Sequence, residues 1–491
     1  MNEILRSELN EQRLKDMFRL SQDVRIESVR LGPAGREHKV VLLYCQGMAQ
    51  HDQINLLALP NLQAMLQKAD KIDPVQLETN ATLLLRRVSG DDWQERFTYY
   101  LYSGELMLFF ESAGLLYALN IAKPPNRTPE ESSTEVSIKG PRDAFTEDMA
   151  TNVALVRKRL LTQSLCCEVI HVGRRSHTSV ALLYIGDVAN PELVQQMRSN
   201  LGKIDVDGLI SSGQLEESLA GSGFSLLPLL EYIGRPDYVA DSLLRGRISL
   251  IVDGSPMALI APASLTLILK SPEDVHFPSY YVLIERMLRA VGLIVAVFFP
   301  GFYIAVTAFN FDQIPFPLLA TIASVRLGLP TSGPMDFFIM LGLFELFREA
   351  GVRLPKAVGQ TVAVVGGLIV GDASIRAGIT GPATLVAVAI STMAMFTLVN
   401  QSLAGSVTLL RIIILMMSAF LGMFGFMISV VALILYLSTL ESFGVPYMIP
   451  FSPPKLRDMY YMFKYKSIKV ARHRPSFLKT TDDTREGGEH S

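Results

Sequence analysis

The stretch AVGLIVAVFFPGFYIAVTAFNF, residues 290–311, contains no charged side chain. A second such stretch, IIILMMSAFLGMFGFMISVVALILYL, covers residues 412–437, and the run 377–410 is also free of charge. The hydrocarbon core of a bilayer is about 30 Å thick and requires roughly 20 apolar residues per helix. The sequence therefore predicts that the C-terminal half of the chain lies in a membrane, so its function must operate in or across that membrane.

The rest of the chain is polar. Hydrophobic residues make up 49% and charged residues 19% of the 491 residues, which fits a soluble half joined to a membrane half. The N-terminal segment MNEILRSELNEQRLKDMFRL has neither an unbroken apolar core nor a small-residue cleavage site, so we expect no secretory signal and a cytoplasmic polar half. The tail 455–479 is basic, with Asp458 as its one acidic residue, which favours the cytoplasmic side.

Residues 25–120 and 166–265 resemble two copies of one unit. Each has an apolar run followed by an amphipathic helix, and later a segment that we interpret as strand, tight glycine turn and strand. The counterparts are KVVLLY (39–44) and SVALLY (179–184), then YSGELMLFFE (102–111) and LRGRISLIVD (244–253). Short apolar runs that alternate with helical patterns predict two related α/β subdomains.

The predicted fold class is α/β, with two related α/β subdomains, plus an all-α polytopic transmembrane bundle. The expected domains are a first cytoplasmic α/β subdomain (1–122), a linker rich in proline and polar residues (123–139), a second cytoplasmic α/β subdomain (140–280), a transmembrane helical domain with four to six membrane segments (281–440) and a basic cytoplasmic tail (441–491). The linker composition cannot build a core.

Four spans are expected in the helical domain. They cover about Met287–Phe309, Ala357–Ile375, Ile379–Val399 and Ile412–Leu437, with Arg286 and Arg289 leading into the first. The stretch 312–356 is too charged or too broken for one long span, so it forms either re-entrant or interfacial helices or two further short spans. Either alternative gives an even number of spans and places both chain ends on the same side.

The second span supplies the candidate pore. Its residues Gly367 and Gly371 form a GxxxG pair, which permits close helix packing. Asp372 is ionisable, with Arg376 on the same helical face, and forms either a polar ring at the mouth of a conducting path or an ion pair at a helix end. The valines line either a hydrophobic constriction or an ordinary packed interface. The candidate pore or gate residues are Val362, Val365, Gly366, Gly367, Gly371 and Asp372.

A second candidate group lies just before that span. Glu345, Arg348, Glu349 and Arg353 recur at helical spacing, and we expect them near the membrane surface. They form either salt-bridged interfacial packing or a coupling element between the soluble half and the pore.

No enzyme signature is found in the sequence. It contains no GxxxxGK[ST] phosphate loop, no HExxH, no GxSxG and no paired CxxC, and its seven histidines show no ligand spacing. The three cysteines, Cys45, Cys166 and Cys167, are expected to be buried reduced thiols. We therefore expect no catalytic site, no cofactor, no metal and no nucleic-acid partner.

The stretch 140–453 resembles the A-subunit family of bacterial spore germinant receptors. The resemblance is carried by GPRDAFTEDMATNVALVRKRL from Gly140, VGRRSHTSVALLY from Val172, NPELV from Asn190, KIDVDG from Lys203, RPDYVADSLLRGRISLIVDGSP from Arg235, SPEDV from Ser271, FELFREAGVRLPKAVGQTVAVVGGLIVG from Phe344, and FLGMFG followed by SFGVPYMIPFSP. The resemblance implies a multi-pass subunit of the spore inner membrane, with cytoplasmic termini. It also implies a permease-like B subunit that binds the nutrient and a lipoprotein C subunit as partners. A related spore paralogue group remains an alternative.

Under this resemblance the chain is expected to form a homo-oligomer that acts as a nutrient-gated channel for monovalent cations and triggers germination. Two alternatives stay open. The chain is a non-conducting scaffold that docks the permease-like subunit, or it is a secondary transporter. The spans show no inverted repeat, which argues against the transporter.

Overall fold

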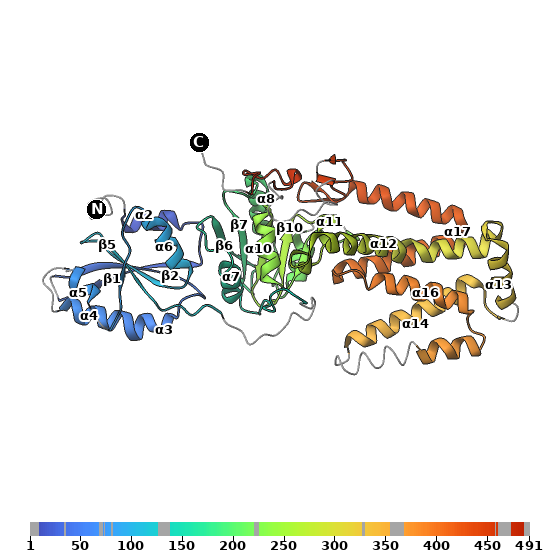
Figure 1. Ribbon diagram of the computed structural model, residues 1–491, viewed down its shortest axis with the longest axis horizontal. Helices are drawn as coiled ribbons and strands as arrows, with labels where there is room; N and C mark the ends of the chain where they lie inside the picture. Colours follow the sequence, from blue (N-terminus) through green and yellow to red (C-terminus); the bar gives the residue numbers. More distant parts are fainter. Residues whose placement is uncertain are drawn as a thin grey trace.

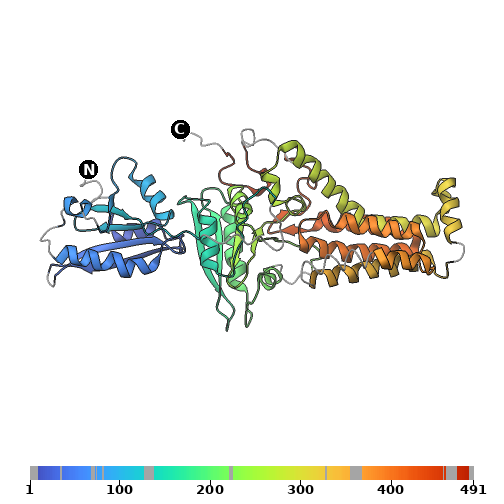
Figure 2. The ribbon, with the colours of Figure 1, turned by 60° about the horizontal axis from the view of Figure 1, so that its bottom comes forward.

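The computed structural model describes residues 9–33, 36–67, 72, 74–79, 82–125, 138–219, 225–326, 329–353, 368–456, 458–459 and 473–485. The molecule is elongated. The first α/β subdomain (blue) lies at one end, the second (green) in the middle, and the helical domain (yellow to red) at the other end (Figure 1). The same order is seen after rotation (Figure 2), so the second subdomain separates the first from the helices.

The first subdomain is a five-stranded antiparallel sheet covered by helices on both faces. Its elements are α2 (Glu11–Met17), β1 (Val24–Leu31), β2 (His38–Cys45), α3 (His51–Gln53), a π-helical turn (Ile54–Ala58), α4 (Leu59–Gln67), α5 (Pro74–Glu78), β3 (Arg86–Arg87), α6 (Trp93–Tyr102), β4 (Leu106–Phe110) and β5 (Leu115–Leu119). The strand order is β1-β2-β4-β5-β3. Successive residues of β2 point to opposite cores: Val41 and Leu43 pack with α2 and α6, whereas Val40 and Leu42 pack with α4 and α5. Burial on both faces explains why these strands are continuously apolar.

The second subdomain repeats this arrangement. Its elements are α7 (Met149–Arg157), β6 (Leu165–Val172), β7 (Thr178–Ile185), α8 (Pro191–Lys203), α9 (Ser212–Leu219), β8 (Glu231–Ile233), α10 (Pro236–Leu244), β9 (Ile248–Val252) and β10 (Ala258–Ala261). The strand order β6-β7-β9-β10-β8 matches that of the first sheet position by position. The structure thus has the two α/β units that the repeated sequence pattern predicts.

One detail of the predicted repeat is wrong. The residues before Gly104 and Gly246 end helices α6 and α10 rather than strands. Phe97 and Leu101 are four positions apart and are both buried, which is the helical spacing. Both glycines do form tight turns, with φ of 96° and 88°, a region that favours glycine.

The helical domain begins with α12 (Ser279–Ile304) and a π-helical turn (Ala305–Phe309). It continues with a short 3₁₀ turn (Phe311–Gln313), α13 (Phe316–Arg326), α14 (Gly333–Arg353), a helical segment at 368–376, α16 (Pro382–Met395) and α17 (Gln401–Thr439). By length and composition, two of the described helices are able to cross a membrane, namely Ser279–Phe309 and Gln401–Thr439.

Helix α17 reverses direction at Gly422, so the prediction of one span over 412–437 is wrong. Gly422 has φ 58° and ψ −140°, which is not helical. A Cβ on Gly425 would overlap the carbonyl of Met417, eight residues earlier, so the chain folds back there. Phe426 then packs against Phe298 and Phe302 of α12, with ring centroids 6.4 and 5.7 Å apart. Glycine alone tolerates this backbone geometry, and an apolar run cannot reveal it.

Contacts along α12 give the direction of its neighbours. Gly301 of α12 lies against Ile414 and Ser418 of the first half of α17, and Phe309 lies against Gly422 at the end far from the soluble subdomains. Ile379 and Gly381 are also at that far end, beside Thr331 and Leu329. Among the described residues, α12, α14, α16 and the two halves of α17 therefore each run along the length of the domain, and the segment 368–376 lies at its far end.

The segment after α17 returns to the second subdomain. Strands β11 (Glu441–Ser442) and β12 (Val445–Pro446) form a small hairpin. The Ser442 hydroxyl donates to the Leu229 carbonyl at 2.7 Å, and the Leu265 amide donates to the Tyr447 carbonyl at 2.9 Å. Further on, the Thr481 amide donates to the Val188 carbonyl at 3.0 Å. The C-terminal segment and the second subdomain therefore lie at the same end of the helical domain.

Candidate functional site

The structure describes only part of the predicted pore. Val362, Val365, Gly366 and Gly367 lie outside the described residues. Gly371 is described and is buried, and a Cβ there would lie 3.4 Å from a methyl of Leu385, so it faces α16 of the same chain.

Asp372 and Arg376 form an ion pair on the helical segment at the far end of the domain. The Arg376 Nε and Asp372 Oδ2 atoms are 2.8 Å apart, and the side chains are 79% and 58% exposed. The pair lies at the end of the helical segment 368–376, and its place at the mouth of a conducting path stays a prediction. Exposed pairs of this kind typically contribute about 0–1 kcal/mol to stability.

The predicted coupling residues differ in their surroundings, and their position near a membrane surface stays a prediction. Glu345 and Arg348 face α16 and α17, whereas Glu349 is exposed, and the side chain of Arg353 is outside the description. The two oxygens of Glu345 contact different guanidinium groups. Oε2 is 2.6 Å from Arg348 on the same helix, and Oε1 pairs with Arg411 on α17.

Arg411 is the functional candidate that the sequence analysis missed. It is fully buried and lies midway along the first half of α17 (401–421), about 15 Å from either end at the helical rise of 1.5 Å per residue. Ionisable groups at such depth in an apolar helical domain are costly and usually serve function. A signal was present, because Arg411 is the one charged residue between Arg376 and Glu441. It was passed over as the boundary between two charge-free runs.

Apart from Glu345, the described neighbours of Arg348 and Arg411 offer these two guanidinium groups few hydrogen-bond acceptors. Arg411 Nη1 donates to the Ser391 hydroxyl at 3.4 Å, and its buried Nε has no hydrogen-bond partner among the described residues. Arg348 Nη1 contacts the Thr408 hydroxyl at 3.2 Å and the Met395 sulfur at 3.1 Å. One carboxylate is thus shared by two guanidinium groups, so the cluster has an excess positive charge.

A second group of buried charges joins the second subdomain to α12. Asp274, in the 3₁₀ turn Pro272–Val275, is 2.8 Å from Arg286 and 2.5 Å from Arg289, both on α12. Arg289 also donates to the Leu269 carbonyl at 2.7 Å. These contacts tie the first turns of α12 to the second subdomain.

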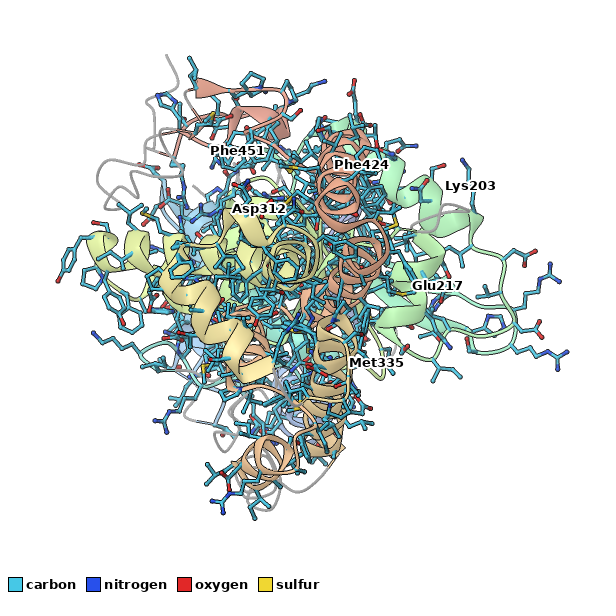
Figure 3. All side chains as sticks on the ribbon, turned by 90° about the vertical axis from the view of Figure 1, so that its right-hand side faces the viewer. Lys203, Glu217, Asp312, Met335, Phe424 and Phe451 are labelled. Atoms are coloured by element: carbon cyan, nitrogen blue, oxygen red, sulfur yellow. The ribbon has the colours of Figure 1, made fainter. Side chains whose placement is uncertain are left out.

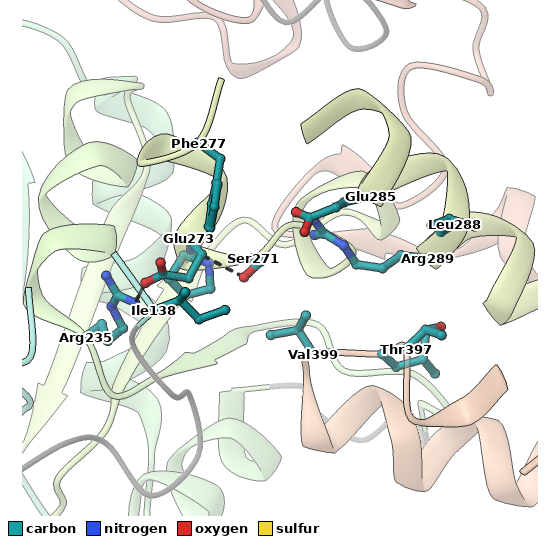
Figure 4. A pocket seen from close by; sticks show the side chains of 12 residues that line it. Ile138, Arg235, Ser271, Glu273, Phe277, Glu285, Leu288, Arg289, Thr397 and Val399 are labelled. Carbon is teal, nitrogen blue, oxygen red and sulfur yellow. Dashed lines mark hydrogen bonds and ion pairs between the residues drawn. The ribbon is translucent and has the colours of Figure 1, made fainter. Parts of the chain in front are cut away.

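A cavity of about 450 Å³ lies beside this joint (Figure 4). Its walls come from the end of the linker (Ile138), the second subdomain (Arg235, Glu273), α12 (Glu285, Arg289) and the loop between α16 and α17 (Thr397, Val399). Burial raises the pKa of Glu273, but hydrogen bonds from Arg235 and from the backbone amides of Lys139 and Gly140 outweigh burial and lower it to about 2.

Arg235 also pairs with Asp237 at 2.6 Å. The charges of Arg235 and Glu273 in this cavity are therefore paired with other described residues.

The comparisons with known proteins all point to the same family. The family model described as Bacillus/Clostridium GerA spore germination protein matches residues 12–477. The chain is 39% identical to Spore germination protein XA of Bacillus anthracis over 98% of this chain and 97% of that protein. It is 32% identical to Spore germination protein KA of Bacillus subtilis (strain 168), over 88% of this chain and 79% of that protein.

A solved structure also matches. It is the crystal structure of the N-terminal domain of the A subunit of the Bacillus megaterium spore germinant receptor GerK3. The identity is 27%, the match covers 51% of this chain and 92% of that chain, and the TM-score is 0.40.

Proposed function

Because this chain belongs to the GerA family of spore germination proteins, we propose that it is the membrane subunit of a spore nutrient-germinant receptor. Copies of the chain assemble into a nutrient-gated cation channel whose opening triggers germination. The observation that carries the germinant-receptor role is the match to the family over residues 12–477 and to a spore germination protein over nearly the whole length of both chains. The proposal of a channel is supported by the geometry of the helical domain.

The outer surface of the helical domain supports the membrane location. Val291, Phe420 and Phe424 are 55%, 77% and 69% exposed, and they belong to the two longest apolar helices. Apolar surface of this extent is unfavourable in water and needs no partner in lipid. The described helices α12, α14, α16 and the two halves of α17 satisfy their own backbone hydrogen bonds, which a segment that crosses a membrane requires. The proposed total is six crossings.

The contacts of the C-terminal segment support the orientation. Residues 473–485 pack on the second subdomain, which is held to the first subdomain by the buried pair of Asp23 and Arg157. These contacts support an arrangement in which both soluble subdomains and the tail share one side, as an even number of crossings would give. The basic tail favours the cytoplasm as that side. The proposed location is the spore inner membrane, multi-pass, with both termini cytoplasmic.

The excess charge of the buried cluster supports a path between copies. Arg348 and Arg411 share a single carboxylate near the midpoint of the domain, and a net positive charge there repels cations. The interior of one copy is thus a poor route for monovalent cations. A route between copies of the chain, lined by the segment that contains Val362, Val365 and Asp372, avoids this barrier.

The permease-like B subunit and the lipoprotein C subunit are the proposed partners, and the soluble domain is the proposed transmitter. Viewed along the long axis (Figure 3), the second subdomain, marked by Lys203 and Glu217, extends beyond the outline of the helices. It therefore has surface available for a neighbour at the cytoplasmic end. The joint of Asp274 with Arg286 and Arg289 would pass its movement to α12.

Reconstitution in liposomes tests this proposal. The purified chain is incorporated into vesicles loaded with K⁺, with and without its B and C subunits, and K⁺ release is followed after addition of nutrient. We expect release that requires the chain and changes when Val362, Val365 or Asp372 is replaced by alanine, with Gly405→Ala as a control on an open helix surface.

Release by the permease-like subunit alone, unaffected by the chain, would support the scaffold instead. Saturable nutrient uptake by the chain alone would support a transporter. Single-particle images of the same preparation check whether copies form a ring.

A further inference from the structure

We propose that Glu345 is an exchangeable latch that holds α14 to the hairpin of α17. Arg411 binds the carboxylate when the latch is closed, and Arg348 takes over the whole carboxylate when α14 moves away. The role in gating rests on the proposed function. The pairing itself stands on the geometry of Glu345, Arg348 and Arg411.

The first observation is the sharing of one carboxylate. Its Oε2 atom is 2.6 Å from Arg348, three residues later on α14, and its Oε1 atom pairs with Arg411 on α17. A carboxylate accepts two parallel hydrogen bonds from one guanidinium with good geometry. Glu345 can therefore form a second ion pair, in which both of its oxygens accept from Arg348. Rotation of the two side chains is sufficient to form it.

The second observation is the low polarity of the surroundings. Arg411 is fully buried among helices whose residues from 377 to 437 are otherwise uncharged. An uncompensated carboxylate in such a setting is strongly disfavoured. Helix α14 can therefore separate from α17 only if Glu345 carries a cation with it, and Arg348 on the same helix is that cation.

The third observation concerns the guanidinium that would be left behind. Arg411 has the Ser391 hydroxyl as a further acceptor, and its Nε lacks a hydrogen-bond partner within the described part of the chain. When α14 moves away, Arg411 keeps the Ser391 hydroxyl but loses its counter-charge, and a buried unpaired guanidinium is costly. This cost keeps the latch closed until the free energy of nutrient binding offsets it.

The latch lies between the soluble joint and the candidate pore. Arg411 is three residues before Ile414, which packs against Gly301 of α12, and α12 is tied to the second subdomain through Asp274. Glu345 is on α14, the helix that leads into the segment 354–376. Movement of α12 therefore reaches the candidate pore through this pair.

Two matched sets of variants test the latch. Glu345→Gln and Arg411→Gln remove one partner each, and the double variant Glu345→Arg with Arg411→Glu exchanges the charges. Arg348→Gln removes the alternative partner but keeps the closed pair. The control is the exposed pair of Arg174 and Asp205 in the second subdomain, with Asp205→Asn and Arg174→Gln.

The first measurement is thermal unfolding of the purified chain in detergent, arranged as a double-mutant cycle. We expect Glu345 and Arg411 to be coupled, with the charge-exchanged variant recovering most of the loss, and the exposed pair to show little coupling. The second measurement is K⁺ release from vesicles that contain the assembled receptor. Glu345→Gln and Arg411→Gln should raise release without nutrient on the order of tenfold, and Arg348→Gln should weaken the nutrient response.

The proposal is overturned if the single variants assemble normally and keep the basal release and the nutrient response of the unaltered chain. It is also overturned if the charge-exchanged variant regains neither stability nor control of release. If a single variant does not fold, the charge-neutral double variant Glu345→Gln with Arg411→Gln keeps the test open, because it should fold yet release K⁺ without nutrient. Absence of any release from the unaltered receptor would reject the proposed function, while the unfolding cycle would still decide the pairing.

Discussion

The Asp23 carboxylate and the Arg157 guanidinium form a bidentate ion pair across the two soluble subdomains. Arg157 Nε and Nη2 each donate to an Asp23 oxygen at 2.8 Å, and Nη1 donates to the carbonyls of Thr162 and Leu165 at 3.0 Å. The guanidinium also lies 4.2 Å from the ring centroid of Tyr102. Beside it, Ser21 bridges to Cys167 of β6, so the first subdomain extends the edge of the second sheet.

We expect Asp23→Asn to destabilise the joint between the subdomains by ~3–5 kcal/mol, because it leaves Arg157 buried without its counter-charge. The check is chemical or thermal unfolding of the full chain in detergent. Asp205→Asn is the matched control, since its partner Arg174 and Asp205 itself are 70% and 63% exposed. Equal stability of the two variants would contradict the prediction.

The reversal in α17 predicts a strong effect at Gly422. Gly422→Ala places a Cβ 2.8 Å from the Phe309 ring and forces a backbone geometry that L residues rarely adopt. We expect the variant to lose at least ~2 kcal/mol and to accumulate poorly in the membrane, measured as detergent-extracted folded protein. Gly405→Ala, where no atom lies within 4 Å, should accumulate as well as the unaltered chain. Normal accumulation of Gly422→Ala would show that the hairpin is absent.

The two titrating carboxyls of the second subdomain predict opposite pH dependences. Burial raises the pKa of Glu216 to about 7, partly offset by a hydrogen bond from the Leu230 amide. Its stabilising contribution is therefore complete below about 4.5 and is lost as the pH rises through 7. Glu216→Gln should unfold at nearly the same temperature as the unaltered chain at pH 5 and at a higher temperature at pH 8.

Glu273, with its pKa near 2, behaves in the opposite way. Its contribution is present above about 4.5 and is lost as the pH falls toward 2. Glu273→Gln should therefore be less stable than the unaltered chain at pH 7, and this difference should shrink in acid. For the Glu216 prediction of the preceding paragraph, the contradicting outcome is a Glu216→Gln variant that keeps the full decline of stability between pH 5 and 8. Another group would then be responsible for that decline.

The docked C-terminal segment predicts local protection in the second subdomain. Arg474 Nε donates to the Leu244 carbonyl at 2.9 Å, Thr480 lies directly on Gly246, and Leu478 is buried. A chain that ends at Arg472 should therefore exchange the amides of residues 186–190 and 241–247 with deuterium faster than the unaltered chain, measured by mass spectrometry. A chain that ends at Arg485 keeps these contacts and is the control. Unchanged exchange after the longer truncation would mean that the segment does not dock.

The sequence was sufficient for features that depend on composition and local spacing. Charge-free runs indicated the helical domain because apolar length is a local property. The repeated order of apolar runs and glycine turns indicated two similar sheets, and Gly104 and Gly246 do take positive φ. The cysteines are buried and free, as their spacing suggested.

Only the tertiary structure decided which distant residues meet. Arg411 stands alone in its sequence, and its partner Glu345 is 66 positions away, so no local pattern joins them. The same holds for Asp23 and Arg157, which are 134 positions apart. The reversal at Gly422 depends on a backbone angle and on Phe309, which packs against the turn. Apolar composition alone does not distinguish a continuous helix from one that folds back. Amino-acid composition determines whether a segment is stable in water or in a membrane. The pairing of buried charges, in contrast, follows from packing that brings remote segments together.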